Sequence, residues 1–90
     1  MRNGLITNKV GTKRYYKDDK LHREDGPAII YPTGTVEYWI NGKKHREDGP
    51  AVIYWDNAEY WINGKLHRED GPAVIYWNGD VEYWINGKYL

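Results

Sequence analysis

The chain lacks several residue types that small proteins commonly use to stabilise a core. Its 90 residues include no cysteine and no phenylalanine, and Met1 is the only methionine. Without cysteine, neither a disulfide nor a thiolate metal site can supplement the core. Lys+Arg and Asp+Glu are both 13, so neither the basic stripe of a duplex binder nor the acidity of a nucleic-acid mimic is present. We therefore expect no nucleic-acid partner.

Long hydrophobic runs are also missing. No stretch approaches the roughly 18 apolar residues of a membrane span, and the first residues lack the apolar segment of a secretory signal. These two absences favour a soluble intracellular protein without a membrane span. The large side chains are mostly Tyr (9) and Trp (5), which join apolar area to a polar atom and suit a thin sheet better than a thick globule.

Two blocks recur along the chain. His-Arg-Glu-Asp-Gly-Pro-Ala is unchanged at 22–28, 45–51 and 67–73, and Glu-Tyr-Trp-Ile-Asn-Gly-Lys is unchanged at 37–43, 59–65 and 82–88. Such self-similarity at a fixed period indicates a repeat protein. We divide the chain, as one repeat domain 1–90, into a partial unit 1–20, units 21–43, 44–65 and 66–88, and a C-terminal end 89–90.

Each unit carries β signals throughout. Runs such as 73–77 and 81–85 are rich in β-branched and aromatic residues, and the Asn-Gly after each second run predicts a type I′ hairpin turn. Asp-Gly-Pro is a further break, since glycine permits unusual φ and proline fixes its own. With no 3.6-residue apolar period, we predict an all-β, elongated antiparallel meander of 22–23-residue hairpin repeats, forming a single-layer or solenoid-like sheet.

The middle copy is one residue shorter than the others and so tests the predicted register. A two-residue loop at 56–57 pairs Tyr54 with Glu59, and a three-residue loop at 78–80 pairs Tyr76 with Glu82. The deletion then falls in the loop and leaves the pairing intact. A helix would instead have rotated its faces by about 100° at that point.

This register assigns the side chains to two faces, because alternate strand residues point to opposite sides. The face with Ile53, Trp55 and Ala58 is expected to be buried. The face with Val52, Tyr54 and Glu59 is expected to be exposed, and exposed Tyr and Trp on a rigid platform are typical of binding sites. The candidate binding rows on the second face are Tyr31, Glu37, Trp39, Tyr54, Glu59, Trp61, Tyr76, Glu82 and Trp84.

The repeated heptapeptide offers groups suited to acid–base work, but its triplication favours a structural joint between units, since repeats must make the same neighbour contacts each time. We expect its Asp to cap the Gly-Pro turn, its Arg to pair with a carboxylate of its own or the next unit, and its His to pack over Tyr. Anion binding by the arginines would have to compete with their acidic neighbours. The joint residues are His22, Arg23, Asp25, His45, Arg46, Asp48, His67, Arg68 and Asp70.

Neither a metal nor a cofactor is expected. Each copy has a single His, with no second His or Cys at metal-ligand spacing. Every Gly belongs to a turn, so no nucleotide-binding loop is present. We also expect no enzymatic activity.

The terminal strands of an open meander have unpaired backbone groups that invite pairing. At the N-terminal end, Lys9, Lys13, Arg14 and Lys17 offer protection. The C-terminal end, with Tyr89 and Leu90, has little protection, so self-association or docking through sheet edges is expected there.

One repeat carries, in order, Trp61, Asn63-Gly64-Lys65, His67, Gly71, Tyr76, Asn78-Gly79-Asp80 and Trp84. This spacing resembles the MORN repeat, a β-hairpin unit with a Trp-x-Asn-Gly-Lys-x-His-Gly core and a later Asn-Gly-Asp turn. It departs from the family in placing Arg-Glu-Asp between His and Gly and in shortening Tyr-x-Gly-x-Trp to Glu-Tyr-Trp, and variants of this type are associated with uncharacterised bacterial, phage and large-virus proteins. The resemblance implies stacked hairpins that bind proteins or lipid head groups without catalysis.

The expected function is a non-catalytic protein-binding module. By fold-level analogy alone, it would be a phage- or mobile-element-type inhibitor of a host antiviral-defence protein, located in the cytoplasm of a bacterial host. Two alternatives stay open. One is an aromatic-cage module for a carbohydrate or choline-like ligand, and the other is a structural repeat that self-assembles.

Overall fold

The computed structural model describes all 90 residues and contains strands and turns only. The strands are β1 Gly4–Thr7, β2 Lys13–Lys17, β3 Lys20–Leu21, β4 Ile29–Ile30, β5 Val36–Glu37, β6 Trp39–Ile40, β7 Lys43–Lys44, β8 Val52–Ile53, β9 Asn57–Glu59, β10 Trp61–Ile62, β11 Lys65–Leu66, β12 Val74–Tyr76, β13 Val81–Glu82, β14 Trp84–Ile85 and β15 Lys88–Tyr89. No helix is available that could cross a bilayer.

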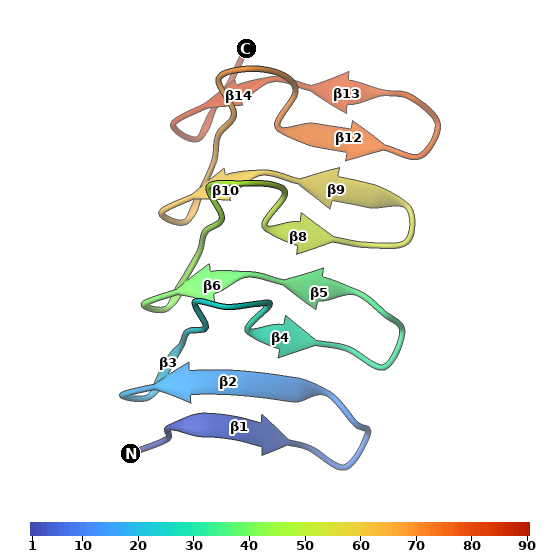
Figure 1. The fold of residues 1–90 in the computed structure, drawn as a ribbon. Helices are drawn as coiled ribbons and strands as arrows, with labels where there is room; N and C mark the ends of the chain where they lie inside the picture. The colour runs from blue at the N-terminus through green and yellow to red at the C-terminus, as the bar shows by residue number, and fades with distance from the viewer.

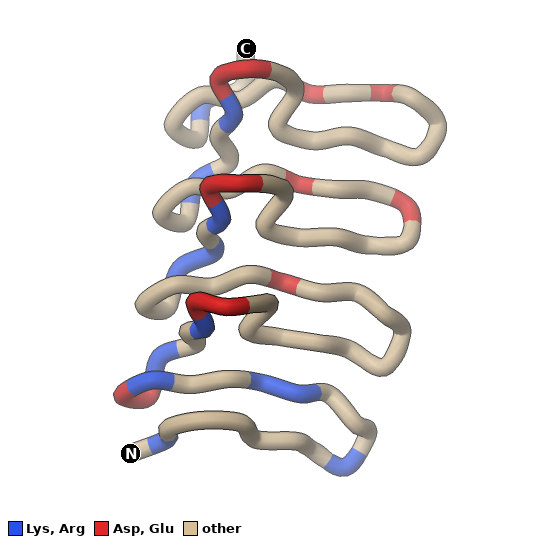
Figure 2. The backbone as a smooth tube through the Cα atoms, viewed as in Figure 1, with Lys and Arg blue, Asp and Glu red and all other residues tan.

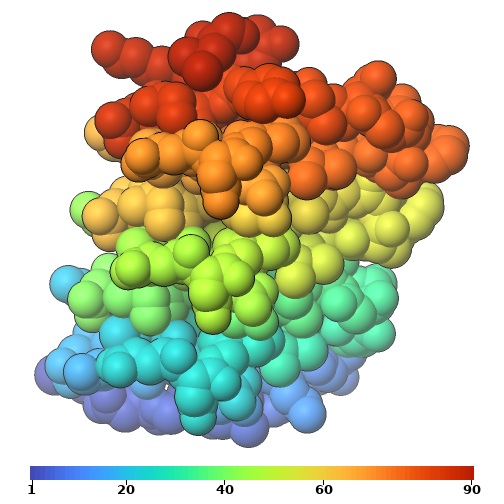
Figure 3. Space-filling model, turned by 45° about the horizontal axis from the view of Figure 1, so that its top comes forward, coloured from blue at the N-terminus to red at the C-terminus, as the bar shows by residue number.

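The main sheet is an open antiparallel meander in the order β1-β2-β4-β5-β8-β9-β12-β13, with β3 also paired to β2. Each unit adds one hairpin to the growing sheet, so the units stack from the N-terminus to the C-terminus (Figures 1 and 3). The molecule measures 39 × 24 × 18 Å. The predicted all-β, elongated meander is confirmed.

A second, smaller hairpin closes each unit at the Asn-Gly turn. In the first of these, β6 pairs with β7 across Asn41 and Gly42, whose φ angles are 50° and 79°. Two successive positive φ angles are the mark of a type I′ turn, and the same values recur in the pairs β10–β11 and β14–β15. The predicted turn type is therefore confirmed.

The predicted strand register was wrong by two residues. Glu59 lies opposite Val52 instead of Tyr54, and Tyr54 N donates to Asn57 O at 2.8 Å. The loops are therefore residues 55–56 in the middle unit and 77–79 in the last, where Gly79 adopts a φ of 92°. The deletion still falls in the loop, and a shift of two leaves each side chain that remains in a strand on its predicted face.

The core is one thin layer of small side chains. Each unit buries one alanine and one β-branched residue, which are Ala28 and Ile29, Ala51 and Val52, and Ala73 and Val74. The three β-branched residues lie on the face that we expected to be exposed, so that expectation was wrong. On this face Glu37, which pairs with Ile29 and Val52, is itself bonded by Tyr31 and Trp39.

Candidate functional site

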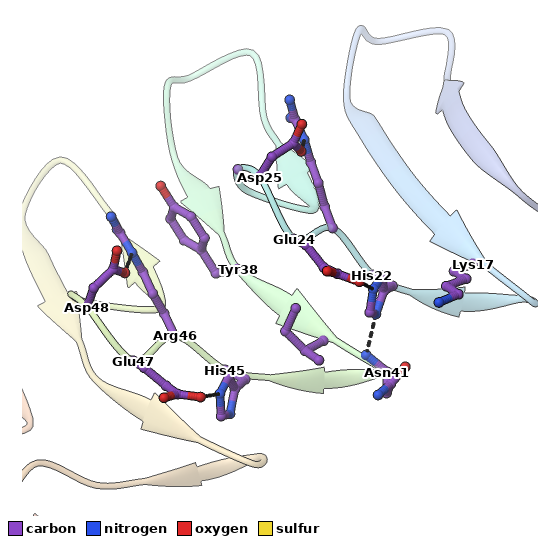
Figure 4. Close-up of a pocket in the computed structure, with 13 residues that line it drawn as sticks. Lys17, His22, Glu24, Asp25, Tyr38, Asn41, His45, Arg46, Glu47 and Asp48 are labelled. Carbon is purple, nitrogen blue, oxygen red and sulfur yellow. Dashed lines mark hydrogen bonds and ion pairs between the residues drawn. The ribbon is translucent and has the colours of Figure 1, made fainter.

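The arginine of each heptapeptide links two units. Arg46 Nε donates to Asp48 Oδ1 at 3.0 Å and another guanidinium nitrogen donates to Pro50 O at 3.2 Å. Its guanidinium carbon lies 4.0 Å from the ring centre of Tyr38 in the preceding unit (Figure 4). The same distance recurs for Arg23 over Tyr15 and for Arg68 over Tyr60. The arginine, and not the expected histidine, is therefore the residue that covers the tyrosine.

The histidine of each heptapeptide has both ring nitrogens engaged. His45 Nδ1 accepts from Asn63 N at 3.0 Å, and Nε2 lies 3.1 Å from Glu47 Oε2. Because a backbone N–H can only donate, Nδ1 must be the unprotonated nitrogen, and Nε2–H donates to the carboxylate. His22 and His67 repeat both contacts. None of the three offers a free nitrogen for acid–base chemistry.

The glycine of Asp-Gly-Pro serves close packing and not an unusual φ. Gly49 has no positive φ, but a Cβ built there would lie 3.1 Å from Arg46 Cζ. The expectation that this glycine is needed for its φ was wrong, because the approach of the guanidinium is the constraint. In the first joint, the hydrogen bond and then the charge of Arg23 lower the pKa of Asp25 below its usual value.

Open grooves lie between successive joints. The first has a volume of about 690 Å³ and is lined mainly by the His-Arg-Glu-Asp residues of two units, with Tyr38, Ile40 and Asn41 between them. The second, of about 750 Å³, repeats this lining one unit later. No three histidine or carboxylate side chains lie close enough to share a metal ion. Figure 4 shows the carboxylates of the first groove turned toward their own histidine and arginine.

The predicted binding rows are covered and not displayed. Glu37 is only 8% exposed and accepts from Tyr31 Oη at 3.2 Å and from Trp39 Nε1 at 2.8 Å. Trp61 and Trp84 make the same bond to Glu59 and Glu82. All nine row residues are buried or half-buried, so the expectation that these rows are exposed was wrong.

The tyrosine contact differs between the units. Tyr76 Oη donates to Glu82 at 3.0 Å, whereas Tyr54 in the shortened unit makes no such bond to Glu59. For Tyr76 the hydrogen bond to Glu82, followed by burial and the carboxylate charge, raises the pKa above its usual value. For Tyr31 and Tyr54 burial is the main cause of the raised pKa, followed by the charge of the adjacent carboxylate.

A lysine lies between the Trp39 and Trp61 rings, whereas an open groove of about 360 Å³ lies between Trp61 and Trp84. Lys44 Nζ lies 5.9 Å from the Trp39 ring and 4.7 Å from the Trp61 ring. One unit later Leu66 takes the place of the lysine opposite Trp61. At the C-terminal end, the Tyr89 ring lies 5.2 Å from that of Trp84. The aromatic-cage alternative therefore stays a prediction, since the groove between Trp61 and Trp84 is open.

Two exposed tryptophans were missed by the sequence reasoning. Trp55 and Trp77 lie in adjacent loops and are 85% and 77% exposed, and Trp77 N donates to Asp56 O at 2.8 Å. The predicted register places Trp55 in a strand on the buried face. The available signal was Pro32, which occupies the equivalent position in the first unit and cannot donate to a strand ladder.

No family model matches the chain, and no similar protein is found among curated proteins or solved structures. The resemblance to the MORN repeat therefore stays an expectation. Function is inferred from the contacts and surfaces of the chain itself.

Proposed function

We propose that the protein is a non-catalytic, protein-binding repeat module. The exposure of Trp55 and Trp77 in two hydrogen-bonded loops carries this proposal. Tryptophan is enriched in binding hot spots, since it offers a large contact area at a low cost in side-chain entropy. Loops held by a sheet present such residues with little motion to lose on binding.

The joints support the non-catalytic part of the proposal. Their histidines and arginines make the same internal bonds in all three units. A catalytic group must reach the atoms of a substrate, and these groups already bind the protein's own backbone and carboxylates. Identical use in each unit is typical of contacts that hold repeats together.

As a target, we propose a host antiviral-defence protein, which the module would inhibit as phage- or mobile-element-type proteins do. This step rests on the MORN-like resemblance and on fold-level analogy. Small size and an exposed aromatic pair agree with it, because an inhibitor needs a binding surface and no catalytic apparatus.

Affinity capture from a bacterial lysate tests the proposal. The wild-type chain should retain one or a few proteins that the Trp55→Ala/Trp77→Ala variant does not retain. Val10→Ala serves as the control, since it removes an exposed apolar side chain from the loop between β1 and β2, away from the loops of Trp55 and Trp77. Equal retention by the loop variant, or no retained protein at all, would contradict the proposal.

A further inference from the structure

A continuous apolar row crosses one face of the main sheet. Cross-strand pairing joins, in order, Ile30, Val36, Ile53, Ala58, Ile75 and Val81. Residues paired in this way point to the same face, so the six side chains form one line, named here the apolar row. None is buried, and Val81 is 41% exposed. The row is therefore partly exposed, with five half-buried members and one exposed member at its C-terminal end.

The joints stand on the same face as the apolar row. Arg46 lies over Tyr38, which is two residues beyond Val36 along the extended chain and so points to the same side. Arg68 lies over Tyr60, which is two residues beyond Ala58 and points to the same side as Ala58. In the sequence of each unit, the joint comes directly before the strands that contribute residues to the apolar row. The row is thus bordered on one side by the three joints.

The joints present negative charge to solvent. Their carboxylate side chains are 77–89% exposed, whereas their arginines are 24–25% exposed and their histidines 9–15%. Figure 2 shows these acidic positions stacked in one column. This column, named here the acidic ridge, consists of Glu24, Asp25, Glu47, Asp48, Glu69 and Asp70.

We infer that this face binds a basic amphipathic helix of a partner protein. The inference rests on the proposed protein-binding function, names the class of partner and adds this face as a second contact surface to the loops of Trp55 and Trp77. The apolar side of the helix would cover the apolar row, and its lysines or arginines would lie along the acidic ridge. Charge complementarity of this kind sets the orientation of a partner and speeds its association.

The shape of the face favours a helix over an extended segment. A sheet face has no free backbone groups and accepts side chains, and a single helix can pack on such a face through its side chains. Extended segments add instead to sheet edges. The apolar row spans five strand spacings, or about 24 Å, which corresponds to about 16 residues of helix.

Charge argues against other occupants. Phosphate groups of a nucleic acid or an anionic membrane would be repelled by the acidic ridge. A second copy of the chain would bring a second acidic ridge to the same face. A cationic helix is the occupant that would cover the apolar row and pair with the three glutamates, since each aspartate of the ridge is already paired with an arginine.

The test uses a labelled helical peptide of about 18 residues with leucine on one side and lysine on the other, measured by fluorescence anisotropy. The whole chain should bind this peptide at one site, more weakly as salt is added. The same peptide with glutamate in place of lysine should not bind.

Two variants of the chain locate the site. Glu24→Gln/Glu47→Gln/Glu69→Gln removes three charges while the amide oxygen still accepts from each His Nε2. Ile53→Thr/Ile75→Thr keeps β-branched residues in the strands but removes apolar area from the row. Each should lower the affinity for the lysine peptide by about tenfold.

A matched control removes three carboxylates from elsewhere on the surface, namely Asp18→Asn/Asp56→Asn/Asp80→Asn, and should leave the affinity unchanged. An equal loss with this control would reveal general attraction to acidic protein and overturn the inference. If only Trp55→Ala/Trp77→Ala lowers the affinity for the lysine peptide, the peptide binds at the loops. This result would overturn the inference but not the proposed function. If no peptide binds while lysate capture succeeds, only the inference fails, and if both fail, neither stands.

Discussion

The guanidinium carbon of Arg46 lies 4.0 Å from the centre of the Tyr38 ring and so joins two consecutive units. The same arginine donates to Asp48 and to the Pro50 carbonyl of its own unit. In repeat proteins the interfaces between neighbours determine how stably the array holds together. This arginine is therefore the side chain most closely tied to the stacking of the units.

Replacing this arginine tests its role. Arg46→Lys keeps the positive charge but loses the planar stacking and the two directed bonds, so it should lower the free energy of unfolding by about 1 kcal/mol. Chemical denaturation measures the change. Arg2→Lys is the control, because Arg2 lies 4.3 Å from the Tyr16 ring but is far more exposed. An equal effect of the two substitutions would contradict the special role of the joint.

The glycine beside this arginine should be coupled to it. Gly49→Ala places a Cβ 3.1 Å from Arg46 Cζ and should push the guanidinium off Tyr38, destabilising the protein by about 1 kcal/mol. Once the arginine is truncated the clash disappears, so Arg46→Ala/Gly49→Ala should be no less stable than Arg46→Ala. Additive losses in this double-mutant cycle would show that the glycine serves another purpose.

Two equivalent tyrosines should respond differently to removal of their hydroxyl groups. Tyr76 donates to Glu82, and Tyr54 makes no matching bond to Glu59. Tyr76→Phe should therefore cost about 1 kcal/mol of unfolding free energy, while Tyr54→Phe should cost far less. Urea denaturation at neutral pH compares the pair, and similar losses would argue that the bond to Glu82 contributes nothing.

The same tyrosines predict a loss of stability at alkaline pH. The pKa of Tyr31, Tyr54 and Tyr76 is raised in the folded protein, so the fold favours the neutral phenol. Their contribution is complete below the unfolded pKa of about 10 and is lost as pH rises through the higher folded pKa. Unfolding measured at stepped pH should show this fall, and Tyr31→Phe/Tyr76→Phe should reduce it. If the variant loses as much stability at alkaline pH as the wild-type chain, groups other than these tyrosines cause the loss.

Lengthening the short loop of the middle unit should stabilise the protein. Asn57 Oδ1 is buried without a hydrogen-bond partner, and it lies in the unit that lacks the tyrosine–glutamate bond. Replacing residues 55–57 with the Trp-Asn-Gly-Asp of the last unit should restore that bond and raise the unfolding free energy by about 1 kcal/mol. The reciprocal graft into the last unit should lower it, and a destabilised first graft would contradict this account.

The strand register is the part of the fold that local sequence patterns did not predict correctly. A tyrosine followed by a tryptophan is compatible both with the end of a strand and with the start of a loop. The predicted strands include Trp55 and Trp77. Both lie in loops. The proline at the equivalent position 32 marked the true boundary, but only a comparison of all three units would have revealed it.

By itself, the sequence determined the repeat period, the absence of helices and the Asn-Gly turns. These features depend on backbone preferences and on alternation within one unit, both of which act over a few residues. The tertiary structure alone decided which face is covered and which aromatic side chains remain outside. Those outcomes depend on contacts between units, such as Arg46 on Tyr38, and on side chains folding back over Glu37. The apolar row and the acidic ridge come together for the same reason, because only the stacked units place the joints beside the strands.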